Sequence, residues 1–330
     1  MKKIAINIIV CFLLIIPFDF CLEFIDWFRN EILNISIEEL KEYNKHGINL
    51  VSPFHYTLKH ISFEEYYKNE SKNYSDDRRI TRSSNHNKGA IIIFGDSFAY
   101  GAWLDDNETL NYQLSKLTGR TVYNRGFSGT GLNELLFLTR YNDFYNDIDN
   151  NNVSLAVYTF IPEHVFRMYW SKYGILGHIH FTHVGYTVKN GMLVEDNNIF
   201  TYLSALKIVR KIIKSYYDNK ITEKYSQNIS DAIFLYFMSA RNELQKRYPN
   251  IKFVILKHPH FIGDSWLYDK IYNSKLWKKL EDEGFYIYDM NTCIDSDIFN
   301  VEKGYILIDN HPGPKLWQDM SLKLKEDLDL

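Results

Sequence analysis

AIIIFGDS, residues 90–97, is the stretch of this sequence that decides the fold. Five apolar residues that end at a glycine are typical of a short strand buried on both faces of a parallel sheet. Open α/β sheets bind their ligands at the carboxyl ends of such strands. Ser97 follows this strand, so its hydroxyl would be exposed and its backbone N–H could donate to an oxyanion. The alternative interpretation is that Asp96 and Ser97 only cap the next helix.

Strand-like and helix-like segments alternate along the rest of the chain. Short apolar runs predict strands over 121–123, 153–160, 251–256 and 285–288, and longer runs predict helices over 107–117, 132–141, 231–247, 266–280 and 314–324. This alternation favours an α/β fold with a parallel sheet and helices on both faces. The segment 167–228 interrupts it. We interpret this segment as an insertion near the site, with a hairpin over 185–194 and a helix over 203–217.

The composition is that of a globular protein with a full core. The 330 residues are 45% hydrophobic and 24% charged, which fits one large α/β domain with an N-terminal extension, or two small domains. The net charge is -3 and no long basic stripe is present, so we expect no nucleic-acid partner. The three cysteines predict no disulfide framework. The sequence holds no glycine-rich phosphate loop, so we expect no cofactor.

The N-terminus has the pattern of a membrane-targeting segment. Lys2 and Lys3 precede an uncharged apolar run over 4–18, and no small-residue cleavage site follows. We expect residues 1–28 to be a signal anchor or signal peptide, with the protein anchored in the membrane outside the cytoplasm, or secreted or periplasmic. The alternative is a buried N-terminal helix of a soluble protein. We interpret 29–88 as a polar lead-in segment and 89–330 as the main domain.

Three stretches resemble the sequence blocks of the SGNH (GDSL-type) serine hydrolases. They are FGDSFAYG at 94–101, VYNRGFSG at 122–129 and IDNHPGP at 308–314. The resemblance implies that Ser97 is the nucleophile, that Gly129 donates a backbone N–H to the oxyanion hole, and that Asp309 and His311 are the acid and the base. It also implies a three-layer α/β/α sandwich with a short parallel sheet in flavodoxin-like order.

The chain departs from the family pattern at two places. Many members have two residues between the acid and the base, whereas only Asn310 separates Asp309 from His311. The third family block supplies an Asn to the oxyanion hole, but the equivalent strand end here reads TFIPEH, residues 159–164. His164 is our candidate for the third donor, with a surface histidine as the alternative. One missing donor typically costs about 3 kcal/mol of transition-state stabilisation.

Other polar clusters are open to competing interpretations. His178, His180 and His183 stand close together without a neighbouring cysteine or carboxylate, so we expect a polar face of the insertion rather than a metal site. His258 and His260 follow a predicted strand and either line the pocket or lie in an exposed loop. The second Gly-Asp-Ser, which ends at Ser265, follows no buried strand, so helix capping explains it better than a second nucleophile.

These residues predict a serine esterase that acts on acyl esters of surface glycans or lipids. In such a mechanism His311 takes the proton of Ser97, Asp309 orients the imidazole, and an acyl-enzyme forms. One alternative is an acyltransferase that acetylates a cell-surface polysaccharide, since the same triad serves when a sugar hydroxyl replaces water. Another is an inactive binding or assembly protein with the same fold. The oligomeric state does not follow from the sequence.

Overall fold

The computed structural model describes the chain over residues 61–62, 80–83, 88–146, 148, 152–165, 167, 181–182, 186–189, 192–195, 226–258, 275–294, 297–307 and 310–330. The chain divides into two compact units. In the first unit (Met1–Tyr67, Trp170–Gly185 and Asp196–Lys224), the described residues form the parallel strands β1 (Ile61–Ser62) and β6 (Phe181–Thr182). The second unit (Lys68–Tyr169, Tyr186–Glu195 and Tyr225–Leu330) contains the predicted site. The expected anchor, 1–28, lies outside the described residues.

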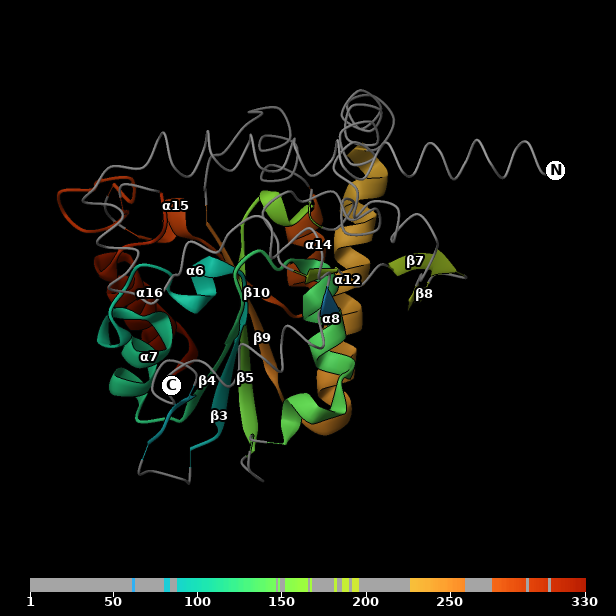
Figure 1. The fold of residues 1–330 in the computed structure, drawn as a ribbon, viewed down its shortest axis with the longest axis horizontal. Helices are drawn as coiled ribbons and strands as arrows, with labels where there is room; N and C mark the ends of the chain where they lie inside the picture. Colours follow the sequence, from blue (N-terminus) through green and yellow to red (C-terminus); the bar gives the residue numbers. More distant parts are fainter. Residues whose placement is uncertain are drawn as a thin grey trace, which may run out of the picture. The chain divides into compact units, whose positions relative to one another are not determined.

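A six-stranded sheet forms the middle layer of the second unit (Figure 1). Five of its strands are parallel, and the edge strand β2 is antiparallel to β4. When the five parallel strands are numbered by their order in the chain, their order across the sheet is 2-1-3-4-5, as in flavodoxin-like sheets. This order confirms the predicted fold class. The spatial order is β10 (Tyr286–Asp289), β9 (Lys252–Lys257), β5 (Val153–Phe160), β3 (Ala90–Gly95), β4 (Val122–Gly126) and β2 (Ile80–Thr81).

Helices cover both faces of the sheet, which explains why β3 is apolar at every position and wholly buried (Figure 1). One face carries α6 (Ser97–Tyr100), α7 (Leu110–Thr118) and α16 (Pro314–Leu328). The other carries α8 (Leu132–Arg140), α12 (Ser226–Arg247) and α14 (Leu276–Asp282). This cover is expected for parallel strands, because the crossover connections that join them place helices on the sheet.

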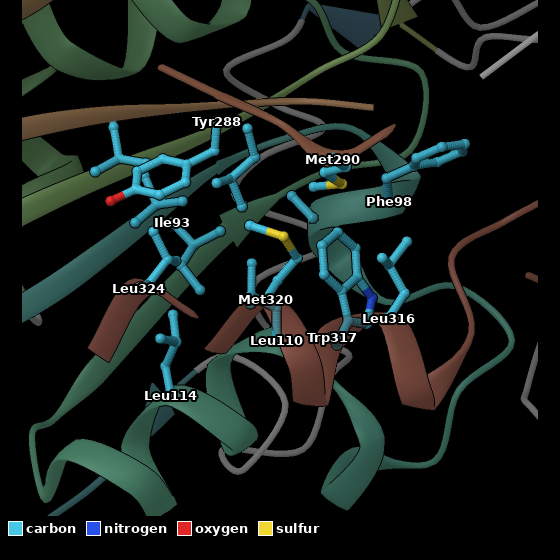
Figure 2. Close-up of a cluster of buried hydrophobic side chains, with 14 of the residues drawn as sticks. Ile93, Phe98, Leu110, Leu114, Tyr288, Met290, Leu316, Trp317, Met320 and Leu324 are labelled. Carbon is cyan, nitrogen blue, oxygen red and sulfur yellow. The ribbon is translucent and has the colours of Figure 1, made fainter. Parts of the chain in front are cut away.

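Each face has its own core. Figure 2 shows the α16 face, where Trp317, Met320 and Leu324 cluster with Leu110 and Leu114 of α7. Phe98 of α6 belongs to the same cluster and is almost fully buried. The opposite face is aromatic, with edge-to-face contacts among Tyr158, Phe160, Phe237, Phe253, Trp277 and Phe285. The short helix α6 is therefore fixed to the core through its second residue.

Most predicted elements are confirmed, with shifted bounds. The helix expected over 107–117 is divided into η2 (Asp106–Glu108) and α7, and α12 begins at Ser226 rather than at 231. The helix expected over 266–280 is described only as α14, because 259–274 lie outside the described residues. The predicted hairpin forms as β7 (Tyr186–Lys189) and β8 (Met192–Glu195), which pair antiparallel.

Strand β2 falls inside the segment 29–88, which the sequence predicts to be a polar lead-in, and yet it belongs to the sheet. Its two residues contain no apolar run that would indicate a strand. Long-range bonds hold this segment instead: the Asn111 amide donates to Thr81 Oγ1 at 2.8 Å, and Ser83 Oγ donates to the Gly119 carbonyl at 2.6 Å. The main domain therefore begins before residue 89.

Gly126 ends β4 directly beneath α6, and a methyl group there would collide with backbone. A Cβ would lie 2.7 Å from the Ala99 carbonyl carbon and closer still to the Tyr100 nitrogen. We expect Gly126→Ala to lower the free energy of unfolding by about 1–3 kcal/mol, as overpacking does. The measurement is urea unfolding against Gly119→Asn as control. Gly119 has a left-handed φ of 67° that Asn tolerates, and no atom lies within 4 Å of the added carbon. Equal stabilities for the two variants would contradict the packing argument.

Candidate active site

The turn that carries Ser97 needs a glycine before it and a carboxylate within it. Gly95 ends β3 with φ 143°, and a Cβ there would collide with Thr159 Oγ1. Asp96 caps α6, because its Oδ1 accepts a hydrogen bond from the Phe98 nitrogen at 3.0 Å. The cap of α6 is therefore made by Asp96, and the Ser97 hydroxyl has a different partner.

That partner is His311, as the C-terminal block predicts. His311 Nε2 lies 2.9 Å from Ser97 Oγ, although the two residues are 214 positions apart in the sequence. Both side chains are partly buried. A serine hydroxyl at this distance from an imidazole nitrogen can transfer its proton as it attacks an electrophile.

A tight turn presents His311 to the site. The Asn310 nitrogen donates to the Leu307 carbonyl at 2.9 Å, and the Leu307 nitrogen donates to the His311 carbonyl at 2.8 Å. Asn310 has φ 68°, a left-handed conformation that Asn accepts more readily than most residues. Asp309, the expected acid, lies outside the residues that the structure describes.

The ring of Phe98 lies against two histidines. Its centroid is 4.9 Å from that of His311 and 5.0 Å from that of His258. His258 is fully buried just after β9, and its nitrogen donates to the Phe160 carbonyl at 2.9 Å. The interpretation of His258 as an exposed loop residue is therefore wrong, whereas His260 lies outside the described residues. Phe98 links the core to the orientation of His311.

Gly129 lies in the loop that follows β4, and this loop is tied to the end of β3. The Phe127 nitrogen donates to the Gly95 carbonyl at 3.0 Å, and Thr130 Oγ1 donates to the same carbonyl at 2.8 Å. Gly129 itself has φ 79°, which favours glycine. The loop expected to hold an oxyanion donor is thus joined to the turn that carries Ser97.

His164 occupies a different environment from the one expected. The side chain is fully buried, with Nδ1 2.8 Å from the Tyr158 hydroxyl oxygen and Nε2 3.2 Å from Asp96 Oδ2. Donation to an oxyanion would require His164 to leave one of these partners. His164 was expected to donate to the oxyanion, whereas both of its ring nitrogens face buried polar groups.

Arg167 completes this buried cluster and was not singled out from the sequence. Its Nη1 lies 2.6 Å from Asp96 Oδ2 and donates to the Thr130 carbonyl at 2.8 Å. The signal that could have identified it is the spacing of three from His164, which places the two on one side of a helical turn after β5.

Burial and charge act in opposite directions on this cluster. Burial alone would raise the pKa of the Asp96 carboxyl, but His164 and the Arg167 cation hold that pKa well below its ordinary value. Burial lowers the pKa of His164, and this effect exceeds the opposing influence of Asp96. At neutral pH the cluster is therefore an Asp96–Arg167 ion pair with a neutral imidazole beside it.

Within the described residues, no group of three or more His, Cys, Asp or Glu side chains could hold a metal ion. His178, His180 and His183 lie outside these residues, so their interpretation as a polar face stays a prediction. Across the same part of the chain, no helix has the length and apolarity needed to cross a bilayer.

Comparisons with known proteins give a likeness of fold. No family model matches the sequence, and no curated protein matches it. Among solved structures, a lipase from a goat rumen metagenome is similar at 11% identity and a TM-score of 0.46, covering 72% of this chain and 97% of its own. A GDSL-like lipase from Bacteroides thetaiotaomicron is similar at 12% identity and 0.41, covering 80% and 96%.

A carbohydrate esterase family 2 enzyme from Corynascus thermopiles (Myceliophthora fergusii) is also similar, at 16% identity and a TM-score of 0.41. The match covers 75% of this chain and 68% of that enzyme. A GDSL-like lipase is thus among the structures to which this chain is similar.

The neutral His164 makes stability depend on pH. Its pKa is lower in the folded protein than in the unfolded chain, so below about pH 6.5 the unfolded state binds more protons and stability falls. His164→Gln removes this group. We expect the stability advantage of the wild type over the variant to shrink by up to about 1.4 kcal/mol per pH unit below about pH 6.5. Urea unfolding at a series of pH values measures it. A difference that stays constant with pH would contradict a buried neutral imidazole.

Proposed function

We propose that the protein is a serine esterase that cleaves acyl esters through an acyl-enzyme on Ser97. The observation that carries this proposal is the 2.9 Å contact between Ser97 Oγ and His311 Nε2. It lies where the parallel strand β3 ends, the edge at which open α/β sheets bind ligands.

The chemistry follows from this pair. Ser97 Oγ attacks the ester carbonyl carbon while its proton moves to His311 Nε2. The carbon–oxygen bond to the alcohol then breaks, and the alcohol leaves with the proton from His311. Water repeats the attack on the acyl-enzyme, its proton passes through His311 to Ser97 Oγ, and the carboxylic acid is released.

Three further groups have roles in the proposal. The backbone N–H groups of Ser97 and Gly129 would donate to the oxyanion of the tetrahedral intermediate. Support comes from the bonds that join the Gly129 loop to the end of β3, through Thr130 and Phe127. Asp309 would orient His311, as the C-terminal block of the family implies, since it stands two residues before the base.

The substrate class in the proposal is an acyl ester of a surface glycan or lipid. It follows from the expected N-terminal anchor, which would place the catalytic domain outside the cytoplasm. Acyl transfer to a polysaccharide is the related alternative, since a sugar hydroxyl can replace water at the acyl-enzyme. Product analysis with an acyl donor, in the presence and absence of a sugar acceptor, separates the two reactions.

Fluorophosphonate labelling tests the nucleophile. We expect the wild type to be labelled and Ser97→Ala to remain unlabelled, because the hydroxyl that would attack phosphorus is gone. Hydrolysis of a small acyl ester should fall by about 10³-fold or more in Ser97→Ala and in His311→Ala, as it does when a catalytic triad loses a member.

The matched control is Ser265→Ala, which removes the hydroxyl of the second Gly-Asp-Ser and should leave labelling unchanged. Loss of labelling in the control would move the nucleophile to Ser265. A folded wild type that is neither labelled nor hydrolytic would overturn the esterase and favour the inactive binding protein.

Membrane attachment through residues 1–28 is the second part of the proposal. Its support is the pair Lys2 and Lys3 followed by an uncharged apolar run. We expect the full-length chain in the membrane fraction and a chain without residues 1–28 in the soluble fraction. Recovery of the full-length chain in the soluble cytosolic fraction would contradict the anchor and favour a buried N-terminal helix.

A further inference from the structure

We propose that Arg167 is a positioning residue that fixes the two backbone donors of the oxyanion hole, Ser97 and Gly129, relative to each other. This inference rests on the proposed esterase function. It concerns a residue that lies outside all the sequence blocks that indicated the site.

One nitrogen atom of Arg167 bridges the segments that hold Ser97 and Gly129. Arg167 Nη1 lies 2.6 Å from Asp96 Oδ2 and donates to the Thr130 carbonyl at 2.8 Å. Asp96 directly precedes Ser97, and Thr130 directly follows Gly129. Each contact is therefore one residue away from an expected N–H donor, and the two donor segments share one guanidinium group.

The charge of Asp96 makes this bridge obligatory. The carboxylate is fully buried, and its other oxygen already accepts the bond that caps α6. A buried anion that loses its cation is strongly destabilised, and the surrounding backbone must shift to hydrate it. Without Arg167, the turn that holds Ser97 would rearrange, and the Thr130 carbonyl would lose a charged donor.

The neutral imidazole of His164 lies beside the same carboxylate oxygen that Arg167 contacts. Tyr158 and His164 are both fully buried, and the Tyr158 hydroxyl lies 2.8 Å from His164 Nδ1. A hydroxyl that donates to Nδ1 leaves the ring proton on Nε2, which faces Asp96 Oδ2 at 3.2 Å. Because this imidazole is neutral, Arg167 is the only full positive charge beside Asp96 in the described cluster.

Arg140 offers a control for the loss of an arginine ion pair, with a carboxylate partner that is partly exposed rather than fully buried. It contacts a carboxylate and a backbone carbonyl, as Arg167 does: Nε lies 3.4 Å from Glu243 Oε1, and Nη1 donates to the Leu193 carbonyl at 3.3 Å. Neither partner adjoins Ser97 or Gly129 in the sequence. Arg140→Met therefore reproduces the loss of an arginine ion pair without touching the donor segments.

The experiment compares Arg167→Met, Arg167→Lys and Arg140→Met with the wild type, using kcat and KM on a small acyl ester and the rate of fluorophosphonate labelling. We expect Arg167→Met to lose about 10²-fold or more in kcat, the order seen when an oxyanion donor is lost. KM should change little, because the donors act on the transition state. Arg167→Lys should recover part of kcat, and Arg140→Met should match the wild type.

The double variant Asp96→Asn with Arg167→Met separates positioning from folding. It removes the buried charge together with its cation, so thermal stability should return toward the wild-type value while kcat stays low. Recovery of kcat along with stability would reduce Arg167 to a structural ion pair and overturn the inference, as would an Arg167→Met variant that matches Arg140→Met in kcat. A folded wild type that neither labels nor hydrolyses overturns the proposed function, and the positioning role with it.

Discussion

The buried carboxylate of Asp96 is the constraint on which the site depends. A charge sealed in a protein interior must be paired and hydrogen-bonded, or it destabilises the fold. Asp96 meets this requirement with the Phe98 nitrogen on one oxygen and with Arg167 on the other, which His164 Nε2 also faces at 3.2 Å. Because the carboxylate makes the helix cap, the Ser97 hydroxyl can face His311. The same anion draws Arg167 against the Thr130 carbonyl, and so joins the ends of β3, β4 and β5.

Close backbone approach is the second requirement, and it explains why glycines stand where two strands end. Gly95 and Gly126 allow the turn and α6 to lie directly on the neighbouring strands, with no space for a Cβ at either position. Phe98 packs in the hydrophobic cluster that it shares with α16, and this packing holds α6 in place. Its ring also contacts His311, so the packing of one face of the sheet extends to the orientation of the base.

The parts of the fold that could be predicted are those with a local signal. The apolar run of β3 and the alternation of elements indicated a doubly wound sheet, and the family blocks brought Ser97 and His311 together. Strand β2 has only two residues and no periodicity, so its place depends on long-range bonds such as that of Asn111 to Thr81. Arg167 has no motif around it, and its spacing of three from His164 is the one local signal it carries. The burial of His164 depends on the helices that close over β5, which no local pattern records.

The absence of the third-block Asn from this sequence bears on how the oxyanion hole is built. After β5, where that donor would stand, the chain has His164 and Arg167, whose described polar contacts are directed at Asp96, Tyr158 and Thr130. In the proposed mechanism, transition-state stabilisation rests on the two backbone N–H groups of Ser97 and Gly129, each worth about 3 kcal/mol if well placed. A site with two donors tolerates less misplacement than a site with three, because no further donor makes up for a weakened hydrogen bond to the oxyanion. The buried ion pair of Asp96 and Arg167 behind the turn is a physical means of keeping these two donors correctly placed.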